Sequence, residues 1–247
     1  MRDQTLFLNR LFAIAVIVKG DGMSSDGKMH MKERLLGKQR VAKIIKILRQ
    51  TYPDAKCRLD FRSPLELLVG TILAAQCTDD RVNIVTKDLF RKYKSAADYA
   101  QADPEQLQQE IRSTGFFRNK ARSIIGAAGK IVEDFGDQVP RTMDELLTLP
   151  GVARKTANVV LGNAFGLSKG IVVDTHVIRV SMRLRITDVQ KPQPEKIEQD
   201  LMKVVPGKHW MMFSHWVLFH GRAVCMARKP DCPHCPIAKL CPSAGKG

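Results

Sequence analysis

Residues 149–161 read LPGVARKTANVVL, and this stretch decides the fold. It follows the tetrapeptide TMDE at 142–145, which has the pattern of a capping box that starts a helix. A Pro-Gly turn comes next, and a helix–hairpin–helix is therefore predicted at about residues 143–165. Apolar residues after the turn recur at the spacing of a buried helix face: Ala157, Val160, Leu161 and Ala164.

The hairpin between these two helices is a candidate phosphate-binding site. Backbone N–H groups at such a turn point outward, and the positive end of the second helix's dipole favours an anion there. The candidate residues are Gly151, Ala153 and Arg154. An ordinary helical corner would need the same turn, so the hairpin alone leaves both interpretations open.

Helix signals continue along the rest of the chain. Ser63-Pro64-Leu65-Glu66 combines an N-cap serine, a proline at the first helical position and a capping glutamate. Asp103-Pro104 is predicted to open a helix that Gly115 ends. The best strand candidate, Ile171-Val172-Val173, is too short to build a sheet. The fold is therefore predicted to be all-α, with further helices at 41–52, 121–135, 154–165, 175–184, 194–205 and 209–220.

The charge is the most unusual feature of the composition. The 247 residues include 40 basic and 25 acidic ones, a net charge of +15 that favours a polyanionic partner. The surplus is +7 in residues 1–56, +2 in 57–170 and +6 in 171–247. If the two ends fold together, they form one basic body beside a nearly neutral one. A basic surface kept for solubility is the alternative.

Four of the six cysteines follow the pattern Cys225-x6-Cys232-x2-Cys235-x5-Cys241. Four thiolates in so short a segment repel one another unless a metal centre holds them together. Zinc modules usually present two C-x2-C pairs, whereas this segment has one close pair flanked by wider gaps. The wider gaps favour the four separated corners of a 4Fe–4S cluster, with zinc as the alternative.

Two further residues decide between DNA binding and catalysis. Lys155 lies in the first turn of the second hairpin helix, and Asp174 opens the next predicted helix. Taken singly, Lys155 could contact phosphate and Asp174 could be an N-cap. Together with the cysteine spacing, they point to a catalytic pair.

Several separate segments carry a resemblance to one family. They are LAAQCTD at 73–79, LPGVARKTANVVL at 149–161, VDTHVIR at 173–179, HGRAVCMARK at 220–229 and the cysteine spacing. Over about residues 33–242 the chain resembles endonuclease III, a family of helix–hairpin–helix DNA glycosylases. The resemblance implies that Lys155 is the nucleophile, that Asp174 is the essential aspartate and that the four cysteines bind a 4Fe–4S cluster.

The resemblance also implies a domain organisation. A six-helix barrel would span residues 57–170, and residues 31–56 together with 171–247 would form the iron–sulfur domain, which agrees with the charge distribution. Residues 1–30 are interpreted as a disordered N-terminal extension. Its apolar run, Leu11–Val18, is far shorter than the ~20 residues of a membrane span. A monomer in the bacterial cytoplasm, at the nucleoid and without membrane contact, is expected.

The partner implied by the resemblance is damaged double-stranded DNA. A base inside a duplex is unreachable, so the nucleotide must be flipped out. Gln76 and Phe116 correspond to the residues that fill the gap, although the family commonly has an aliphatic side chain where this chain has Phe116. His176 is a candidate phosphate contact.

The expected reaction is removal of oxidised pyrimidines. The Lys155 amine would attack C1′, and β-elimination from the resulting Schiff base would cleave the strand. A monofunctional mismatch glycosylase of the same superfamily is one alternative, disfavoured by Lys155 because those enzymes lack lysine there. A non-catalytic helix–hairpin–helix DNA-binding module is the other, disfavoured by Lys155 together with Asp174.

Overall fold

The computed structural model describes the backbone of residues 25–246 and the side chains of residues 37–246. The chain divides into two compact units, residues 1–36 and 37–247. The described part of the first unit is the beginning of helix α1 (Ser25–Thr51). Of the extension expected at residues 1–30, residues 1–24 lie outside the described residues. Residues 25–30 belong to helix α1.

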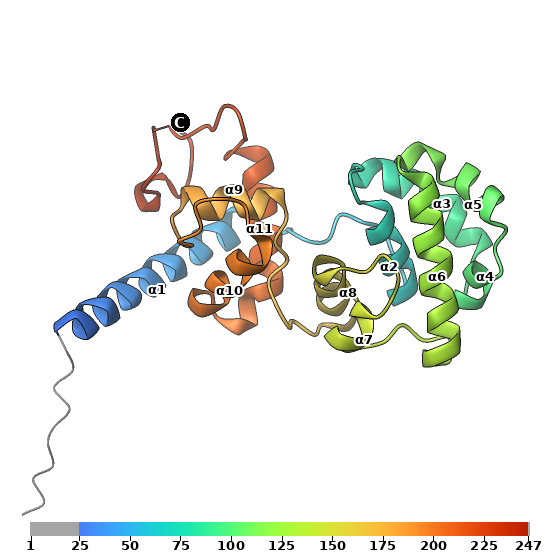
Figure 1. The fold of residues 1–247 in the computed structure, drawn as a ribbon. Helices are drawn as coiled ribbons and strands as arrows, with labels where there is room; N and C mark the ends of the chain where they lie inside the picture. Colours follow the sequence, from blue (N-terminus) through green and yellow to red (C-terminus); the bar gives the residue numbers. More distant parts are fainter. Residues whose placement is uncertain (1–24, 247) are drawn as a thin grey trace, which may run out of the picture. The chain divides into compact units, whose positions relative to one another are not determined.

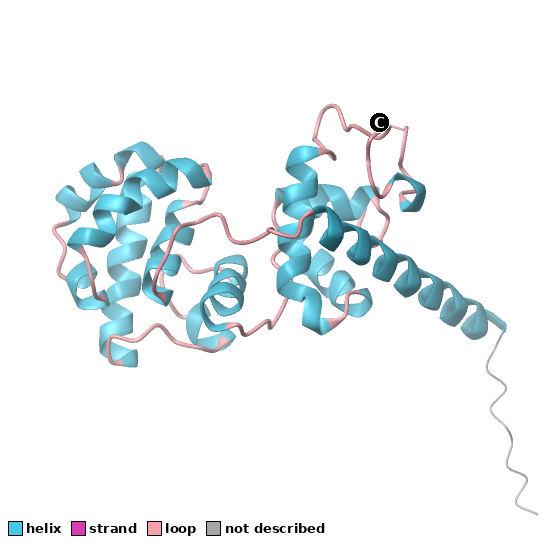
Figure 2. Ribbon diagram, turned by 180° about the vertical axis from the view of Figure 1, so that it is seen from behind, coloured by secondary structure: helices cyan, strands magenta, loops and turns pink. Residues whose placement is uncertain are grey.

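The described residues contain helices and turns and no strand, so the prediction of an all-α fold is confirmed (Figure 2). None of these helices combines the length and apolar character that crossing a membrane requires. After α1 come α2 (Pro64–Leu73), α3 (Asp79–Lys92), α4 (Ala96–Ala100), α5 (Pro104–Glu110), the 3₁₀ turn η1 (Arg112–Thr114), α6 (Phe117–Phe135), α7 (Met143–Leu147), α8 (Arg154–Phe165), α9 (Thr175–Arg183), α10 (Pro194–Val204), η2 (Gly207–His209), α11 (Trp210–Ala223) and η3 (Ala238–Leu240).

Helices α2 to α8 share one hydrophobic core, and residues 59–165 are called the central lobe below (Figure 1). Helix α6 packs against α2, α4 and α5, while α8 packs against α2 and α7. Leu68, Ile124 and Leu161 are among the side chains fully removed from solvent. Each such burial stabilises the fold by about 1.5–3 kcal/mol. The helix–hairpin–helix is therefore part of the core of this lobe.

A second core joins the last turns of α1 to helices α9, α10 and α11. Its largest buried side chains include Ile44, Leu48 and Phe213. Residues 41–55 and 171–241, which supply this core, are called the terminal lobe below. Segments from the two ends of the chain thus pack together around one set of apolar side chains.

The helix starts follow from local capping. Ser63 Oγ accepts a hydrogen bond from Glu66 N at 3.2 Å, and the Glu66 carboxylate accepts one from Arg62 N at 2.6 Å. Thr142 Oγ1 accepts from Glu145 N at 3.3 Å at the start of α7. Both predicted helix starts are therefore confirmed, although the Glu66 carboxylate caps Arg62 and not Ser63 itself.

One predicted helix end differs from the structure, and two helices were not predicted. The helix that opens at Pro104 ends at Glu110 and not at Gly115, because the chain tightens into η1, where Thr114 Oγ1 donates to Ile111 O at 2.8 Å. Residues 171–173 are irregular and pair with no strand, which agrees with the expectation that this segment is too short to build a sheet. Helices α3 and α4 were not predicted, since α3 is rich in charged residues and α4 spans five residues.

Candidate functional site

The hairpin between α7 and α8 depends on Gly151. Its φ is +74°, in the left-handed region, and a Cβ there would lie 2.5 Å from Ser123 Cβ on α6. Val152 N donates to Leu149 O at 3.1 Å and closes the turn. Within the described part of the chain, the N–H groups of Gly151 and Ala153 have no acceptor. The hairpin therefore presents free donors beside the start of α8, as an anion site requires.

A cleft of about 540 Å³ contains both residues of the predicted catalytic pair. Lys155, from the first turn of α8, belongs to the central lobe and is exposed. Asp174, from the terminal lobe, is half-buried. Gln76 and His176 also line this cleft, and Phe116 does not. The structure thus brings Lys155 and Asp174 to one cavity although they come from different lobes.

Asp174 is held by the helix that it starts. Its Oδ1 accepts hydrogen bonds from His176 N and Val177 N, each at 2.8 Å, so it is the N-cap of α9. The Asp174 carboxylate therefore lies at the positive end of the α9 dipole. The second oxygen, Oδ2, has no hydrogen-bond partner among the described residues, and it remains available to a group in the cleft.

Two polar residues that were not predicted also line the cleft. His215 Nε2 lies 2.9 Å from Asn163 Oδ1, and this pair joins α11 to α8. Burial lowers the pKa of His215, and the nearby Asp174 carboxylate partly opposes that shift. The sequence does show a histidine within the largely apolar helix segment 210–219, which could have indicated a polar site. Nothing near His215 in the chain indicated that its partner is Asn163.

Arg154, predicted to contact DNA, makes a contact within the protein. Its Nε and Nη2 donate to the two carboxylate oxygens of Glu198 on α10, at 2.6 and 3.2 Å. Glu198 is buried and also accepts from Asn158 Nδ2 at 2.9 Å. The Arg154 side chain remains 41% exposed, so one face is still accessible. This pair links the two lobes next to the hairpin.

The His176 side chain lines the cleft and also contacts Arg179. Its Nδ1 lies 3.0 Å from Arg179 Nη2, while the same guanidinium donates to Gly221 O and Cys225 O. Burial lowers the pKa of His176, with Asp174 acting in the opposite direction and Arg179 adding to the effect of burial. A neutral imidazole is therefore favoured beside Asp174.

Gln76 and Phe116 share an unusual backbone conformation. Their φ values are +54° and +48°, in the left-handed region, which side chains larger than glycine rarely adopt. Phe116 is 62% exposed, although burying its ring would stabilise the fold. Such strain costs about 1–3 kcal/mol per residue and is typical of functional sites. Both residues predicted to enter DNA are therefore exposed on strained turns.

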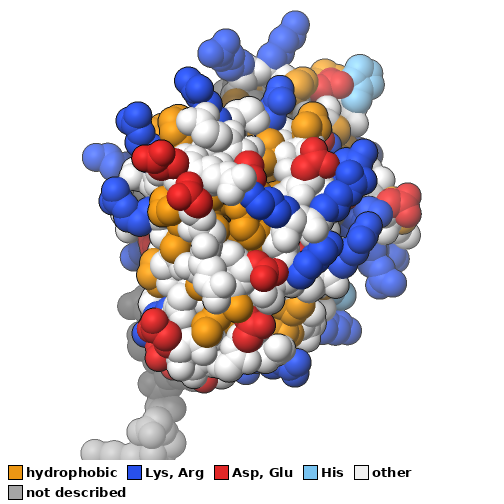
Figure 3. Space-filling view, turned by 90° about the vertical axis from the view of Figure 1, so that its right-hand side faces the viewer, with side chains coloured by type: hydrophobic (Ala, Val, Ile, Leu, Met, Phe, Trp, Pro, Cys, Tyr) orange, Lys and Arg blue, Asp and Glu red, His pale blue; other side chains and the backbone are white. Residues whose placement is uncertain are grey.

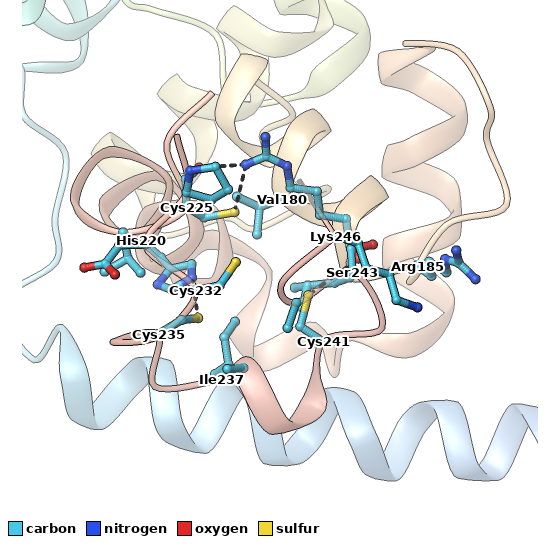
Figure 4. A pocket seen from close by; sticks show the side chains of 17 residues that line it. Val180, Arg185, His220, Cys225, Cys232, Cys235, Ile237, Cys241, Ser243 and Lys246 are labelled. Carbon is cyan, nitrogen blue, oxygen red and sulfur yellow. Dashed lines mark hydrogen bonds between the residues drawn. The ribbon is translucent and has the colours of Figure 1, made fainter. Parts of the chain in front are cut away.

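The four clustered cysteines line one cavity of about 340 Å³ in the terminal lobe (Figure 4). All four are half-buried, and none forms a disulfide. Burial raises the pKa of the Cys235 thiol, with the other three cysteines adding to the effect. The cysteine spacing thus corresponds to convergence around a single cavity.

Two cationic or polar side chains approach the sulfurs. Arg183 Nη1 lies 3.3 Å from Cys225 Sγ, and His220 Nε2 lies 3.6 Å from Cys235 Sγ. His220 Nδ1 is also 3.1 Å from the hydroxyl of Tyr52, the residue directly after α1, so this contact connects the end of α1 to the cavity. Donors of this kind stabilise negative charge on sulfur.

Charge is mixed in sign on one face of the described residues. On the face in Figure 3, Lys and Arg side chains are interspersed with Asp and Glu. Surface pairs include Lys92 with Glu110 at 2.6 Å and Lys130 with Asp134 at 2.6 Å. Exposed pairs of this kind contribute little to stability, because solvent screens the two charges, so they bear on solubility more than on stability.

A protein-family model matches residues 69–207, and it describes the HhH-GPD superfamily of base excision DNA repair proteins. The endonuclease III of a Synechocystis species is 56% identical over 207 residues, which are 84% of this chain and 94% of the relative.

Solved structures give the same result. A trapped endonuclease III–DNA covalent intermediate superimposes with a TM-score of 0.80 and 44% identity, over 85% of this chain and 97% of that one. A thermostable thymine-DNA glycosylase superimposes with a TM-score of 0.76 and 26% identity, over 86% of this chain and 99% of that one.

Proposed function

We propose that Lys155 is the nucleophile and Asp174 its carboxylate partner in this chain, which belongs to the endonuclease III family of DNA glycosylases and AP lyases within the HhH-GPD superfamily. The observation that carries this proposal is the cleft of about 540 Å³ that both side chains line. Lys155 is exposed to that cleft, and the Asp174 carboxylate retains one free oxygen.

The reaction follows from these two groups. The Lys155 amine attacks C1′ of an extruded nucleotide, the glycosidic bond breaks, and the base leaves with the electron pair and takes up a proton. Asp174 stabilises the positive charge that develops on the sugar and accepts a proton from the attacking amine. The sugar ring opens to a Schiff base on Lys155, and loss of the C2′ proton then expels the 3′ phosphate. Water finally releases Lys155 and the cleaved strand.

The groups around the cleft suit damaged DNA. The free N–H groups of Gly151 and Ala153 can bind a backbone phosphate, and His176 can contact another. Gln76 and Phe116 can occupy the space that the extruded nucleotide leaves in the stack. Because Arg154 is already paired with Glu198, we propose a supporting phosphate contact for its exposed face only.

Oxidised pyrimidines are the proposed bases. The Asn163–His215 pair supplies an amide and an imidazole on the wall of the cleft, which are able to bind the carbonyl and N–H groups of such a ring. A mismatch glycosylase is the second candidate, favoured by the likeness to the thymine-DNA glycosylase. The lysine at position 155 favours the bifunctional enzyme.

We propose that Cys225, Cys232, Cys235 and Cys241 hold a 4Fe–4S cluster. The sulfurs of a zinc site lie about 2.3 Å from one ion. The four cysteines include one close pair flanked by wider gaps, and they line a cavity of about 340 Å³, which suits a group of several atoms. A bound cluster would supply four iron–thiolate bonds that tie the loop together.

The division into lobes supports the proposed domains, with a barrel at 57–170 and a cluster domain from 31–56 and 171–247. Lys155 and Asp174 come from the same chain, so a monomer is sufficient for the reaction. Action on DNA would locate the enzyme at the bacterial nucleoid in the cytoplasm.

Borohydride trapping tests the catalytic proposal. Wild-type protein is expected to form a covalent complex with a duplex that carries one abasic site, because borohydride reduces the Schiff base to a stable amine. Lys155→Ala should form none. Asp174→Asn should bind the duplex but turn over more slowly, and Lys169→Ala is a matched control on a lysine outside the cleft. Absence of trapping with wild-type protein would remove the lyase assignment.

Metal analysis tests the cluster proposal. Anaerobically purified protein should contain about four irons and four acid-labile sulfides per chain. Cys235→Ser should lower both contents, whereas Cys57→Ser, on a cysteine that packs against the core of the central lobe and lies outside the four-cysteine cavity, should change neither. Zinc in place of iron in freshly purified protein would contradict the cluster.

A further inference from the structure

A buried lysine connects the two strained turns. Lys120, in the first turns of α6, is 5% exposed, and burial lowers its pKa. Its Nζ donates to Leu73 O at 2.7 Å and to Thr114 O at 2.8 Å. No carboxylate pairs with Lys120 among the described residues. Its partners are main-chain oxygens from two segments that are far apart from each other in the sequence.

Each of these oxygens lies two or three positions before one of the strained residues. Leu73 is the last residue of α2, and Gln76 follows it by three positions. Thr114 ends η1, and Phe116 follows it by two positions. Lys120 therefore holds the start of both turns with one ammonium group.

Elementary electrostatics explains why a cation is placed here. The last carbonyl groups of a helix lack partners within it and carry partial negative charge. Leu73 O and Thr114 O end α2 and η1, and the ammonium satisfies both. A neutral side chain of similar length would leave two buried carbonyl oxygens without donors.

We propose that Lys120 is a positioning residue, which fixes the Gln76 turn relative to the Phe116 turn so that both side chains enter the same gap in a damaged duplex. This inference rests on the proposed role of those two residues in DNA. The backbone amide of Lys120 adds to the constraint, because it donates to Phe116 O at 3.1 Å. Lys120 thus contacts the Phe116 turn through both its main chain and its side chain.

The test measures lesion discrimination, defined as the affinity for a duplex with one tetrahydrofuran abasic analogue divided by the affinity for the same duplex undamaged. Loss of two hydrogen bonds to a charged donor should lower this ratio by about tenfold or more in Lys120→Met. Affinity for undamaged duplex, which depends on phosphate contacts, should stay within about twofold. Lys130→Met, on the same helix and paired only with Asp134, is the matched control and should leave the ratio unchanged.

A double-variant cycle separates positioning from general destabilisation. In a Gln76→Ala/Phe116→Ala background, Lys120→Met should lower the ratio by less than about twofold, because the side chains it positions are gone. An equal loss in both backgrounds, or no loss in the otherwise wild-type chain, would overturn the proposal. If Lys120→Met does not fold, Lys120→Arg and Lys120→Gln replace it. Arginine should retain the ratio within about threefold, glutamine should not, and equal ratios would overturn the proposal.

Wild-type protein separates this inference from the proposed function. If it traps abasic DNA and discriminates lesions while Lys120→Met does the same, the positioning role alone fails. If wild-type protein neither traps nor discriminates, the proposed function fails as well.

Discussion

Replacing Gly151 by alanine is expected to destabilise the hairpin for two separable reasons. The first is backbone strain, since φ is +74° and a residue with a Cβ in this region costs about 1–2 kcal/mol. The second is overpacking, since the new Cβ would lie 2.5 Å from Ser123 Cβ and 2.6 Å from Ser123 Oγ. Overpacking of a filled site costs about 1–3 kcal/mol. The free energy of unfolding should therefore fall by about 2–5 kcal/mol.

Equilibrium unfolding in urea, followed by circular dichroism, measures this loss. In a Ser123→Gly background, the new Cβ at position 151 no longer meets the Ser123 side chain. Gly151→Ala should then lower the free energy of unfolding by the strain contribution alone, relative to Ser123→Gly. Gly129→Ala is the matched control, because Gly129 has open space around its Cβ position and ordinary helical φ. That control should stabilise α6 by about 0.5–1 kcal/mol.

DNA binding provides the functional part of the same prediction. If the free hairpin N–H groups bind phosphate, Gly151→Ala should also weaken binding to undamaged duplex, measured at a temperature where the variant is folded. A Gly151→Ala protein with wild-type stability and wild-type affinity would refute the reasoning.

The remaining predictions concern Glu198, Phe116 and His215. Arg154→Ala leaves the buried Glu198 carboxylate without its cation. The free energy of unfolding should fall by about 1–3 kcal/mol, because the Arg154 side chain is 41% exposed and the hydrogen bond from Asn158 to Glu198 remains. Arg154→Met/Glu198→Leu should recover most of that loss in urea unfolding. Equal stability of the single and double variants would contradict a cost from leaving the buried Glu198 carboxylate unpaired. Phe116→Gly should raise the free energy of unfolding by about 1 kcal/mol, because glycine adopts the left-handed backbone without strain. The same substitution should weaken binding to an abasic duplex by about 1–3 kcal/mol, because the stacking of the ring is lost. Unchanged abasic-site affinity would argue against insertion of the ring. Burial lowers the pKa of His215 below its ordinary value of about 6.5. Below that pH the unfolded chain binds a proton at this imidazole more readily than the folded protein does. The free energy of unfolding should therefore fall as the pH decreases from 7 to 5. His215→Gln should reduce the difference between urea midpoints at these two pH values, and identical differences would contradict the assignment.

The amino-acid sequence by itself determined the part of the local structure that has clear capping and turn signals. The N-caps at Ser63 and Thr142 act over three or four residues, and the predicted helix 154–165 coincides with α8. The hairpin glycine could also be identified, because a Pro-Gly turn between two apolar periodicities needs a positive φ. Such signals operate between neighbours in the chain, so no tertiary contact is required to recognise them.

Only the tertiary structure decided which polar groups meet. The Asn163–His215 pair spans 52 positions, the Arg154–Glu198 pair 44 and the Lys120–Leu73 contact 47. Nothing in the local sequence encodes such a contact, since it depends on how helices dock and on which buried donors and acceptors remain without partners after docking. The left-handed backbone conformation of Gln76 and Phe116 also depends on the tertiary structure. Neither residue type favours this conformation, so the packing around each turn has to impose it.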